Sequence, residues 1–379
     1  MARLGEICTV VSGTTPKSTC PEYWDGNLNW VTPAELTDEC DIIYESQRKI
    51  TQQAVVDSSL KSFPAGTVLL SSRAPIGKVA IAGTEMYCNQ GFKNLVCSDK
   101  IYNRYLYHFL KDKTSYLNSL GRGATFKEIS KSIVENIEIP LPPLDEQRKI
   151  AAVLDKVSEL IAKRRQQLDK LDELVKARFV EMFGDPVENS MGWEKIALGK
   201  RCDIITGNTP SRADPENYGN FIEWIKSDNI NTPAVLLTKA QEYLSETGFH
   251  KCRFVEAGSL LMTCIAGSIN CIGNVAVTDR RVAFNQQINA IVPKQDDVLY
   301  LYWLMQISKP AIQSTINMAL KGILSKGQLS EMAFPFPPLQ LQNQFSVFVK
   351  QTEKTKTIIS RSLEKLETLK KALMQGYFG

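Results

Sequence analysis

Residues 140–147 read PLPPLDEQ, and residues 335–342 read PFPPLQLQ. A double proline ends an extended segment and favours a helix start just after it. From residue 144 to residue 183 the chain contains neither proline nor glycine, and Gly184 followed by Asp185-Pro186 marks an exit. We therefore expect a helix of about 39 residues, about 58 Å long at 1.5 Å per residue. The second motif predicts a matching helix over residues 339–378.

Apolar residues recur in both helical stretches with alternating steps of four and three, the spacing of a coiled-coil seam. Arg164 and Arg178 interrupt the first seam. Two such helices that follow repeated units can pair antiparallel within one chain, because each then carries the chain back to the other end. An aspartate at Leu168 or Leu363 would then cost about 3 to 5 kcal/mol, as expected for an unpaired charge in a dry seam. The predicted seam residues are Ile150, Leu154, Val157, Ile161, Leu168, Leu171, Val175, Phe345, Val349, Ile359, Leu363, Leu366 and Leu373.

The remainder of the chain is also a repeat, with a period of 192 to 196 residues. Residues 12–16 (SGTTP) match residues 206–210 (TGNTP), and residues 88–90 (CNQ) match residues 284–286 (FNQ). Trp30 falls on Trp224. The small drift in the period places insertions in loops and indicates a shared framework, so two copies of one unit fill the chain.

Each copy begins with a globular part that mixes short β-branched runs, such as residues 67–70 and 78–81, with Gly, Pro and Asn punctuation. One amphipathic helix is expected in each, over residues 104–120 and 298–316, with its aromatic residues in the core. The predicted fold class is α+β. The predicted domains are residues 1–143 and 185–338, joined by long helices within 144–184 and 339–379.

Composition places the chain among ordinary folded proteins. It has 379 residues, 43% hydrophobic and 23% charged, with no apolar run long enough to cross a bilayer. The N-terminus lacks the pattern of a signal peptide, so we expect a cytoplasmic protein. Nine scattered cysteines and two histidines favour neither a zinc site nor a disulfide framework. The net charge of +4 restricts any DNA-binding face to a local patch.

A search for catalytic motifs finds no phosphate-binding loop, no dinucleotide fingerprint, no zinc-protease motif and no nucleophile elbow. We therefore predict that this chain is not an enzyme by itself and carries neither a catalytic residue nor a metal site.

Polar residues beside glycine or proline remain as candidates for recognition. Arginine and lysine suit guanine edges or phosphates, and asparagine and glutamine suit adenine edges. Structural roles are open as well: Thr15 and Thr209 can close a turn, Asn89 and Asn285 can be buried amides, and Arg73 can pair with a carboxylate. The candidate DNA-binding residues are Thr14, Thr15, Lys17, Ser72, Arg73, Lys78, Asn89, Gln90, Arg122, Asn208, Thr209, Ser211, Arg212, Asn270, Asn274, Asn285 and Gln286.

The second copy keeps the framework and changes several of these residues. Lys17 becomes Ser211, followed by Arg212, and Lys78 aligns with Asn274. Arg73 aligns near Ile265. Unlike side chains present unlike donor and acceptor patterns, so the two domains are expected to read different base sequences.

The repeated Pro-Pro-Leu-x-x-Gln entry into a long helix, with two globular units, resembles the specificity subunit of type I restriction-modification enzymes. The resemblance implies two target-recognition domains, each reading half of a bipartite double-stranded DNA site. It implies spacer helices that dock DNA methyltransferase subunits, and restriction and translocase subunits in the same complex. S-adenosylmethionine, ATP and magnesium would be bound by those partners. The second motif departs from the first, with Gln340-Leu341 where the first has Asp145-Glu146.

Two other functions stay open at this point. The heptads could dimerise a scaffolding protein whose two domains bind peptides or proteins, or the chain could be an enzyme acting alone. If the recognition hypothesis holds, the half-site centres are expected about one helical turn apart, roughly 10 base pairs.

Overall fold

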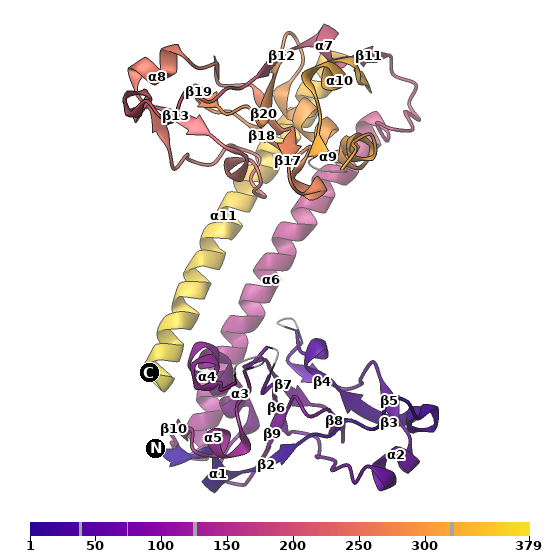
Figure 1. The fold of residues 1–379 in the computed structure, drawn as a ribbon, viewed down its shortest axis with the longest axis vertical. Coiled ribbons are helices and arrows are strands. Elements are labelled where there is room, and N and C mark those ends of the chain that lie inside the picture. The colour runs from indigo at the N-terminus through magenta and orange to yellow at the C-terminus, as the bar shows by residue number, and fades with distance from the viewer. Residues whose placement is uncertain (38–39, 74, 124–126, 319–321) are drawn as a thin grey trace. The chain divides into compact units, whose positions relative to one another are not determined.

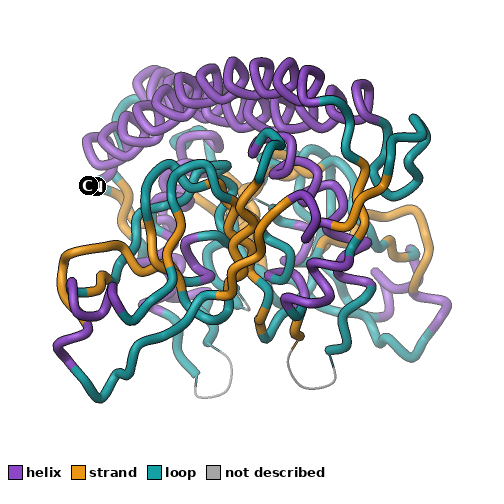
Figure 2. Tube along the Cα trace, turned by 90° about the horizontal axis from the view of Figure 1, so that it is seen from above, coloured by secondary structure: helices purple, strands orange, loops and turns teal. Residues whose placement is uncertain are grey.

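The computed structural model describes residues 1–37, 40–73, 75–123, 127–318 and 322–379. These fall into two compact units: unit 1 holds residues 1–166 and 360–379, and unit 2 holds residues 167–359. Each unit mixes short helices with strands (Figure 2), so the predicted α+β class is confirmed. In the described part of the chain, no helix combines the length and apolar character needed to span a bilayer.

Unit 1 is built on a five-stranded sheet whose central strands are mostly apolar and largely buried. Its order is β2-β9-β6-β7-β4, with antiparallel neighbours except for the parallel pair β7 and β4. A smaller sheet, β5-β3-β8, and a two-stranded pair, β1-β10, complete the unit (Figure 1). The strands are β1 (Ala2–Arg3), β2 (Cys8–Ser12), β3 (Trp24–Val31), β4 (Ile42–Ile43), β5 (Lys49–Ile50), β6 (Val68–Leu70), β7 (Val79–Ala82), β8 (Tyr87–Cys88), β9 (Lys93–Cys97) and β10 (Glu138–Ile139).

Unit 2 repeats this plan with the sheet orders β12-β20-β16-β18 and β14-β13-β19-β15 and the pairs β11-β22 and β17-β21. The long strand of the smaller sheet pairs in parallel with the strand after the central hairpin in both units, β3 with β8 and β13 with β19. The strands are β11 (Lys195–Ala197), β12 (Cys202–Thr206), β13 (Tyr218–Ile225), β14 (Tyr243–Leu244), β15 (Phe254–Val255), β16 (Leu260–Thr263), β17 (Ile265–Ala266), β18 (Val275–Val277), β19 (Val282–Phe284), β20 (Ile288–Pro293), β21 (Gly322–Ile323) and β22 (Ala333–Pro335).

Short helices cover the sheets and supply large side chains to the cores. Tyr105 and Tyr107 of one helix, and Tyr300 and Trp303 of its counterpart, are buried, as the sequence predicts. The α-helices are α1 (Leu4–Ile7), α2 (Gln52–Asp57), α3 (Asn103–Asp112), α4 (Thr114–Leu120), α5 (Lys131–Glu135), α7 (Leu198–Arg201), α8 (Glu246–His250), α9 (Val298–Ser314) and α10 (Lys326–Glu331), with 3-10 turns at Pro21–Tyr23, Pro33–Glu35, Pro215–Asn217, Ser227–Asn229 and Ile269–Cys271.

The predicted single helix over residues 104–120 is wrong, because Lys113 interrupts it and separates α3 from α4. The Thr114 hydroxyl donates a hydrogen bond to the carbonyl of Lys111 at 3.0 Å and lies 3.3 Å from that of Gly77. Such local bonds compete with helix continuation. In unit 2 the corresponding helix α9 continues without a break to Ser314 despite Pro310.

The long helices α6 (Leu144–Phe183) and α11 (Leu339–Phe378) begin directly after the double proline of each motif, as predicted. In unit 2, Phe179 near the end of α6 packs on Phe345 near the start of α11, with ring centroids 5.4 Å apart. In unit 1 the direction is the same: Arg165 donates to Glu367 at 2.7 Å, and the last turns of α11 pack with the first turns of α6. The helices therefore run antiparallel in each unit, which confirms the predicted pairing.

All thirteen predicted seam residues are at least partly buried: seven are buried and six are half-exposed. The buried members are Ile150, Leu154, Val157, Ile161, Val175, Phe345 and Val349. The contact strip between only two helices is narrow, so the other seam positions stay half-exposed. An aspartate at one of them would reach water. The half-exposed members are Leu168, Leu171, Ile359, Leu363, Leu366 and Leu373.

The last turns of both helices pack on their domains through a face that the heptads do not mark. Phe179 and Phe183 are buried instead of Arg178 and Met182, and the equivalent Met374 and Phe378 are buried in unit 1. A helix turns every 3.6 residues rather than 3.5, so its packed face drifts, and here it meets domain side chains. Phe179 stacks on Tyr300 of α9 at 5.6 Å, and Phe378 lies 5.1 Å from Tyr105 of α3.

The last residue of each proline motif joins its long helix to its domain. Gln147 is fully buried; it accepts a hydrogen bond from the backbone N–H of Tyr102 at 2.8 Å and donates to the carbonyl of Lys100 at 3.0 Å. Gln342 is also fully buried and accepts from the N–H of Asp297 at 2.9 Å. Most buried polar groups in proteins are hydrogen-bonded, because an unpaired one costs free energy. This need explains why glutamine stands at the same place in both motifs.

Candidate nucleic-acid interface

The Thr-Pro turn and the Asn-Gln turn of unit 1 meet at one exposed tip. The Thr15 hydroxyl donates to the side-chain oxygen of Gln90, and both side chains are exposed. Beneath them, the Trp30 indole N–H donates to the carbonyl of Thr14 at 3.1 Å. A side chain at Gly13 would place its Cβ only 2.0 Å from the carbonyl oxygen of Asn89, so the two turns can pack this closely only with glycine there.

Unit 2 builds the same tip from its own copy. The Thr209 hydroxyl donates to the side-chain oxygen of Gln286, and both are exposed. The Trp224 indole N–H donates to the carbonyl of Asn208 at 3.4 Å, and a Cβ at Gly207 would lie 2.2 Å from the carbonyl oxygen of Asn285. The repeat is therefore one of contacts as well as of residues.

The burial of two candidate residues, Ser72 and Asn285, contradicts their prediction as DNA-binding residues. Ser72 is fully buried between strands; its hydroxyl lies 3.5 Å from the Lys93 ammonium, and its N–H donates to the Gly91 carbonyl. Asn285 is 7% exposed, and its side-chain oxygen accepts the Gln287 N–H at 3.0 Å. Side chains held this way cannot read a base edge without breaking these bonds, so both serve the framework.

Three other candidates of unit 1, Arg73, Arg122 and Asn89, lie around a short bridge. The backbones of Arg73 and Arg122 each pair with Glu128, whose carboxylate also accepts a hydrogen bond from Lys93 at 3.0 Å. A Cβ at Gly91 would lie 3.0 Å from the Asn89 side-chain oxygen and 3.6 Å from Arg73, so Asn89 and Arg73 approach the same glycine. Lys78 reaches the carbonyl of Pro33 at 3.4 Å, while Lys17 is exposed.

The candidates of unit 2 are engaged with neighbours to different degrees. Arg212 donates to Glu242 at 2.8 Å, and the Asn274 amide donates to Asn231 at 2.7 Å and accepts from Lys309. The Asn208 amide donates to the Lys251 carbonyl at 2.8 Å, which fixes the base of the tip. Ser211 and Asn270 are exposed.

Cations stacked on aromatic rings occur in both units, and sequence reasoning missed them. The Arg48 guanidinium lies 3.7 Å from the ring centre of Trp24, and Trp24 meets Trp30 edge-on at 5.1 Å. In unit 2, Arg212 lies 5.0 Å from Tyr218 and 5.5 Å from Trp224. Trp24 and Trp30 are six residues apart in one strand, and that even spacing could have placed them on one face.

A buried charge network connects α3 of unit 1 with the first half of α6. His108 is 1% exposed, and its Nε2 lies 2.7 Å from the Asp155 carboxylate. Arg104 bridges Asp155 and Asp41, with a distance of 3.1 Å to the latter. Burial lowers the pKa of His108, and the charge and hydrogen bond of Asp155 do not fully restore it. Burial alone would raise the pKa of Asp155, but hydrogen bonds from His108 and Arg104 bring it below its usual value.

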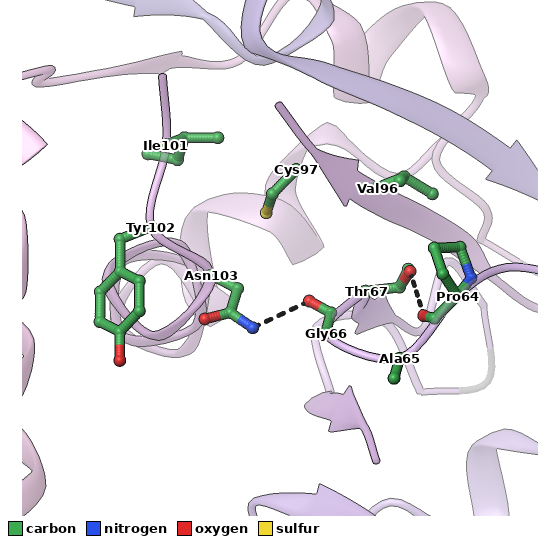
Figure 3. Close-up of a pocket in the computed structure, with 9 residues that line it drawn as sticks. All are labelled: Pro64, Ala65, Gly66, Thr67, Val96, Cys97, Ile101, Tyr102 and Asn103. Carbon is green, nitrogen blue, oxygen red and sulfur yellow. Dashed lines mark hydrogen bonds between the residues drawn. The ribbon is translucent and has the colours of Figure 1, made fainter. Parts of the chain in front are cut away.

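A cavity of about 270 Å³ lies in unit 1 near the start of α3 (Figure 3). The Asn103 amide donates to the Gly66 carbonyl at 3.0 Å and the Thr67 hydroxyl to the Pro64 carbonyl at 2.7 Å. Cys97 also lines it. Since no candidate recognition residue lines this cavity, we do not assign it to the interface.

Taken together, the fold is that of a protein with two equivalent α+β units, paired long helices and polar tips on matched frameworks. The model of the type I restriction modification DNA specificity domain matches residues 1–173 and again residues 191–368. The chain therefore belongs to the family of type I restriction-modification specificity proteins.

Individual relatives agree with this assignment. The type I restriction enzyme MjaIX specificity subunit of Methanocaldococcus jannaschii is 38% identical over 55% of this chain, and the match spans 53%, about half, of that relative. The MjaVIII specificity subunit of the same organism is 23% identical, over 99% of this chain and 90% of the relative.

Two solved structures share the fold. One comes from work on complex assembly and conformational transition of the type I R-M system, with a TM-score of 0.62 and 20% identity over 99% of this chain and 96% of that chain. The other is an S subunit of M. genitalium, with a TM-score of 0.61 and 15% identity over 100% of this chain and 95% of that one.

Proposed function

We propose that this chain is the DNA-sequence specificity subunit of a type I restriction-modification complex. Each globular domain reads one half of a bipartite, asymmetric double-stranded DNA site, and the long helices set the spacing. The observation that carries the proposal is the repeat itself: the turns at the exposed tips of the two units are held by the same contacts, while several polar residues at equivalent positions differ. A protein that reads two different half-sites needs this combination.

The contrast between framework and variable positions is local. Trp30 and Trp224 support the same turn, yet Lys17 beside that turn is replaced by Ser211. Lys78 is replaced by Asn274, so a cation becomes an amide that can both donate and accept. Side chains of different donor and acceptor pattern select different bases.

The partners follow from the same proposal. DNA methyltransferase subunits dock on the long helices, and restriction and translocase subunits join the complex. S-adenosylmethionine, ATP and magnesium are bound by those partners, and this chain is non-catalytic. The proposal keeps the cytoplasmic location expected from the sequence.

A coiled-coil scaffold with two peptide-binding domains was the alternative from the sequence. Antiparallel pairing within each unit argues against heptads that serve to dimerise two chains. The relatives also carry the name of specificity subunits rather than of scaffolds.

Methylome sequencing of cells that carry the complete complex tests the proposal. Exchanging residues 190–338 for another domain of this family should change one half-site and leave the other, because each domain reads independently. Deleting seven residues from the middle of each long helix should change the spacer and keep both half-site sequences. Alteration of both half-sites by the exchange would contradict independent reading, and the unexchanged complex is the control.

A further inference from the structure

We propose that the Thr15–Gln90 pair and the Thr209–Gln286 pair are matched DNA-backbone anchors that carry no base preference. Each pair lies at the exposed tip of its unit, where the Thr-Pro turn meets the Asn-Gln turn, and the word tip refers to this pair below. The inference rests on the proposed function and deepens it: it separates residues that hold the duplex from residues that read it.

The first observation is that the tips are the same in both units. A threonine hydroxyl donates to a glutamine oxygen in each case, although the neighbouring candidates differ. When two domains read different base sequences, a contact that is identical in both can only be made to a feature that every duplex presents. The sugar-phosphate backbone is such a feature, and threonine and glutamine side chains are among the groups that bind phosphate oxygens.

The second observation is the state of the glutamine amide. Its oxygen already accepts the threonine hydroxyl, which sets the amide orientation and leaves the nitrogen as the outer donor. Within the described residues, the side-chain nitrogens of Gln90 and Gln286 make no hydrogen bond, and both residues are exposed. Each tip thus offers two N–H groups to an acceptor outside the chain.

The third observation is the support beneath each tip. The Thr14 N–H donates to the Cys88 carbonyl at 3.0 Å, and the Asn208 N–H donates to the Phe284 carbonyl at 3.1 Å. With the tryptophan and glycine contacts described above, both turns are held in one geometry. A donor held in place loses less entropy on binding. A solvent-exposed hydrogen bond between neutral side chains, by contrast, contributes little to folding, so turn closure alone needs no such support.

Substitutions at Gln90 and Gln286 in the assembled complex test the proposal. The probe is a duplex carrying the site that methylome sequencing identifies, and its dissociation constant is measured over a range of salt concentrations. Gln90→Ala and Gln286→Ala should each weaken binding about tenfold. The target sequence and the salt slope should not change, because a neutral donor releases no counterions. Gln52→Ala, an exposed glutamine outside the tip, is the matched control.

Charge variants sharpen the test. Gln90→Lys should keep the target sequence and steepen the slope of log K against log salt by about 0.9, because a new cation meets a phosphate. Gln90→Glu, nearly the same shape, should weaken binding more than Gln90→Ala. Unchanged melting temperatures and normal assembly would show that these variants fold.

Three results would overturn the inference. A changed base at one position of a half-site would show that the tip reads sequence. Unchanged affinity in both alanine variants would leave the tip as a turn closure only. Loss of assembly with the methyltransferase subunits would make it a protein contact. If the unsubstituted complex shows no sequence-specific methylation, the proposed function fails instead, which is a separate outcome.

Discussion

Replacing Phe179 by alanine should strongly destabilise unit 2. This side chain is fully buried, and its ring contacts Phe183 at 5.0 Å, Phe345 at 5.4 Å and Tyr300 at 5.6 Å. It thus joins the end of α6, the start of α11 and the domain helix α9. Truncating a buried phenylalanine to alanine costs about 3 to 5 kcal/mol, because transfer energy is lost and a cavity remains.

Expressed as melting temperature, that loss is a fall of about 6 to 20 °C, since 1 kcal/mol corresponds to about 2 to 4 °C for a unit of 150 to 250 residues. Urea denaturation and calorimetry of the full chain measure it. Leu174→Ala on the same helix is the control; that leucine is 49% exposed, so its replacement should stay within about 0.5 kcal/mol. Combining Phe179→Ala with Phe345→Ala should reveal a coupling of about 0.5 to 1.5 kcal/mol.

The same variant decides between two helix faces. The heptad pattern places Arg178 in the packed strip, whereas the structure places Phe179 there and leaves Arg178 half-exposed beside Glu181. If Phe179→Ala costs no more than Leu174→Ala, the packing described for the end of α6 is wrong.

Two further predictions concern unit 1 and the helix starts. Gln147→Ala should cost about 1 to 3 kcal/mol in a denaturation experiment, because it leaves the Tyr102 N–H and the carbonyls of Lys100 and Pro142 without their buried partner; the exposed Gln344→Ala should be neutral, and equal effects would refute the argument. Because the pKa of His108 is lowered in the folded chain, the unfolded chain protonates this residue first as pH falls, and the free energy of unfolding should decrease below about pH 6.5. The pKa values of Asp155 and Asp41 are also lowered in the folded chain, so the unfolded chain protonates them first as well, and the decrease should become steeper below about pH 4. His108→Phe should remove the first of these two stages in urea titrations at successive pH values, and the same pH dependence in variant and parent would contradict the role of His108.

Local chemistry along the chain determined much of this protein. The double prolines, the absence of glycine and proline from residues 144–183 and the heptad spacing fix two long helices regardless of what surrounds them. The repeat determined that both units share a framework, since equal residues at equal spacing form equal contacts. The Thr-Pro and Asn-Gln segments were found as candidates in this way, and each pair meets at a tip.

Other features were decided only by tertiary structure, because they depend on which surfaces meet. Phe179 and Met374 are packed by domain side chains that arrive from distant parts of the sequence, so no seven-residue pattern could mark them. Burial of Ser72 and Asn285 follows from the closure of strands and turns around them, whereas their sequence surroundings are as polar as those of an exposed loop. The partners of Arg104 and the stacking of Arg48 on Trp24 likewise join residues whose distance along the chain says nothing about their distance in space.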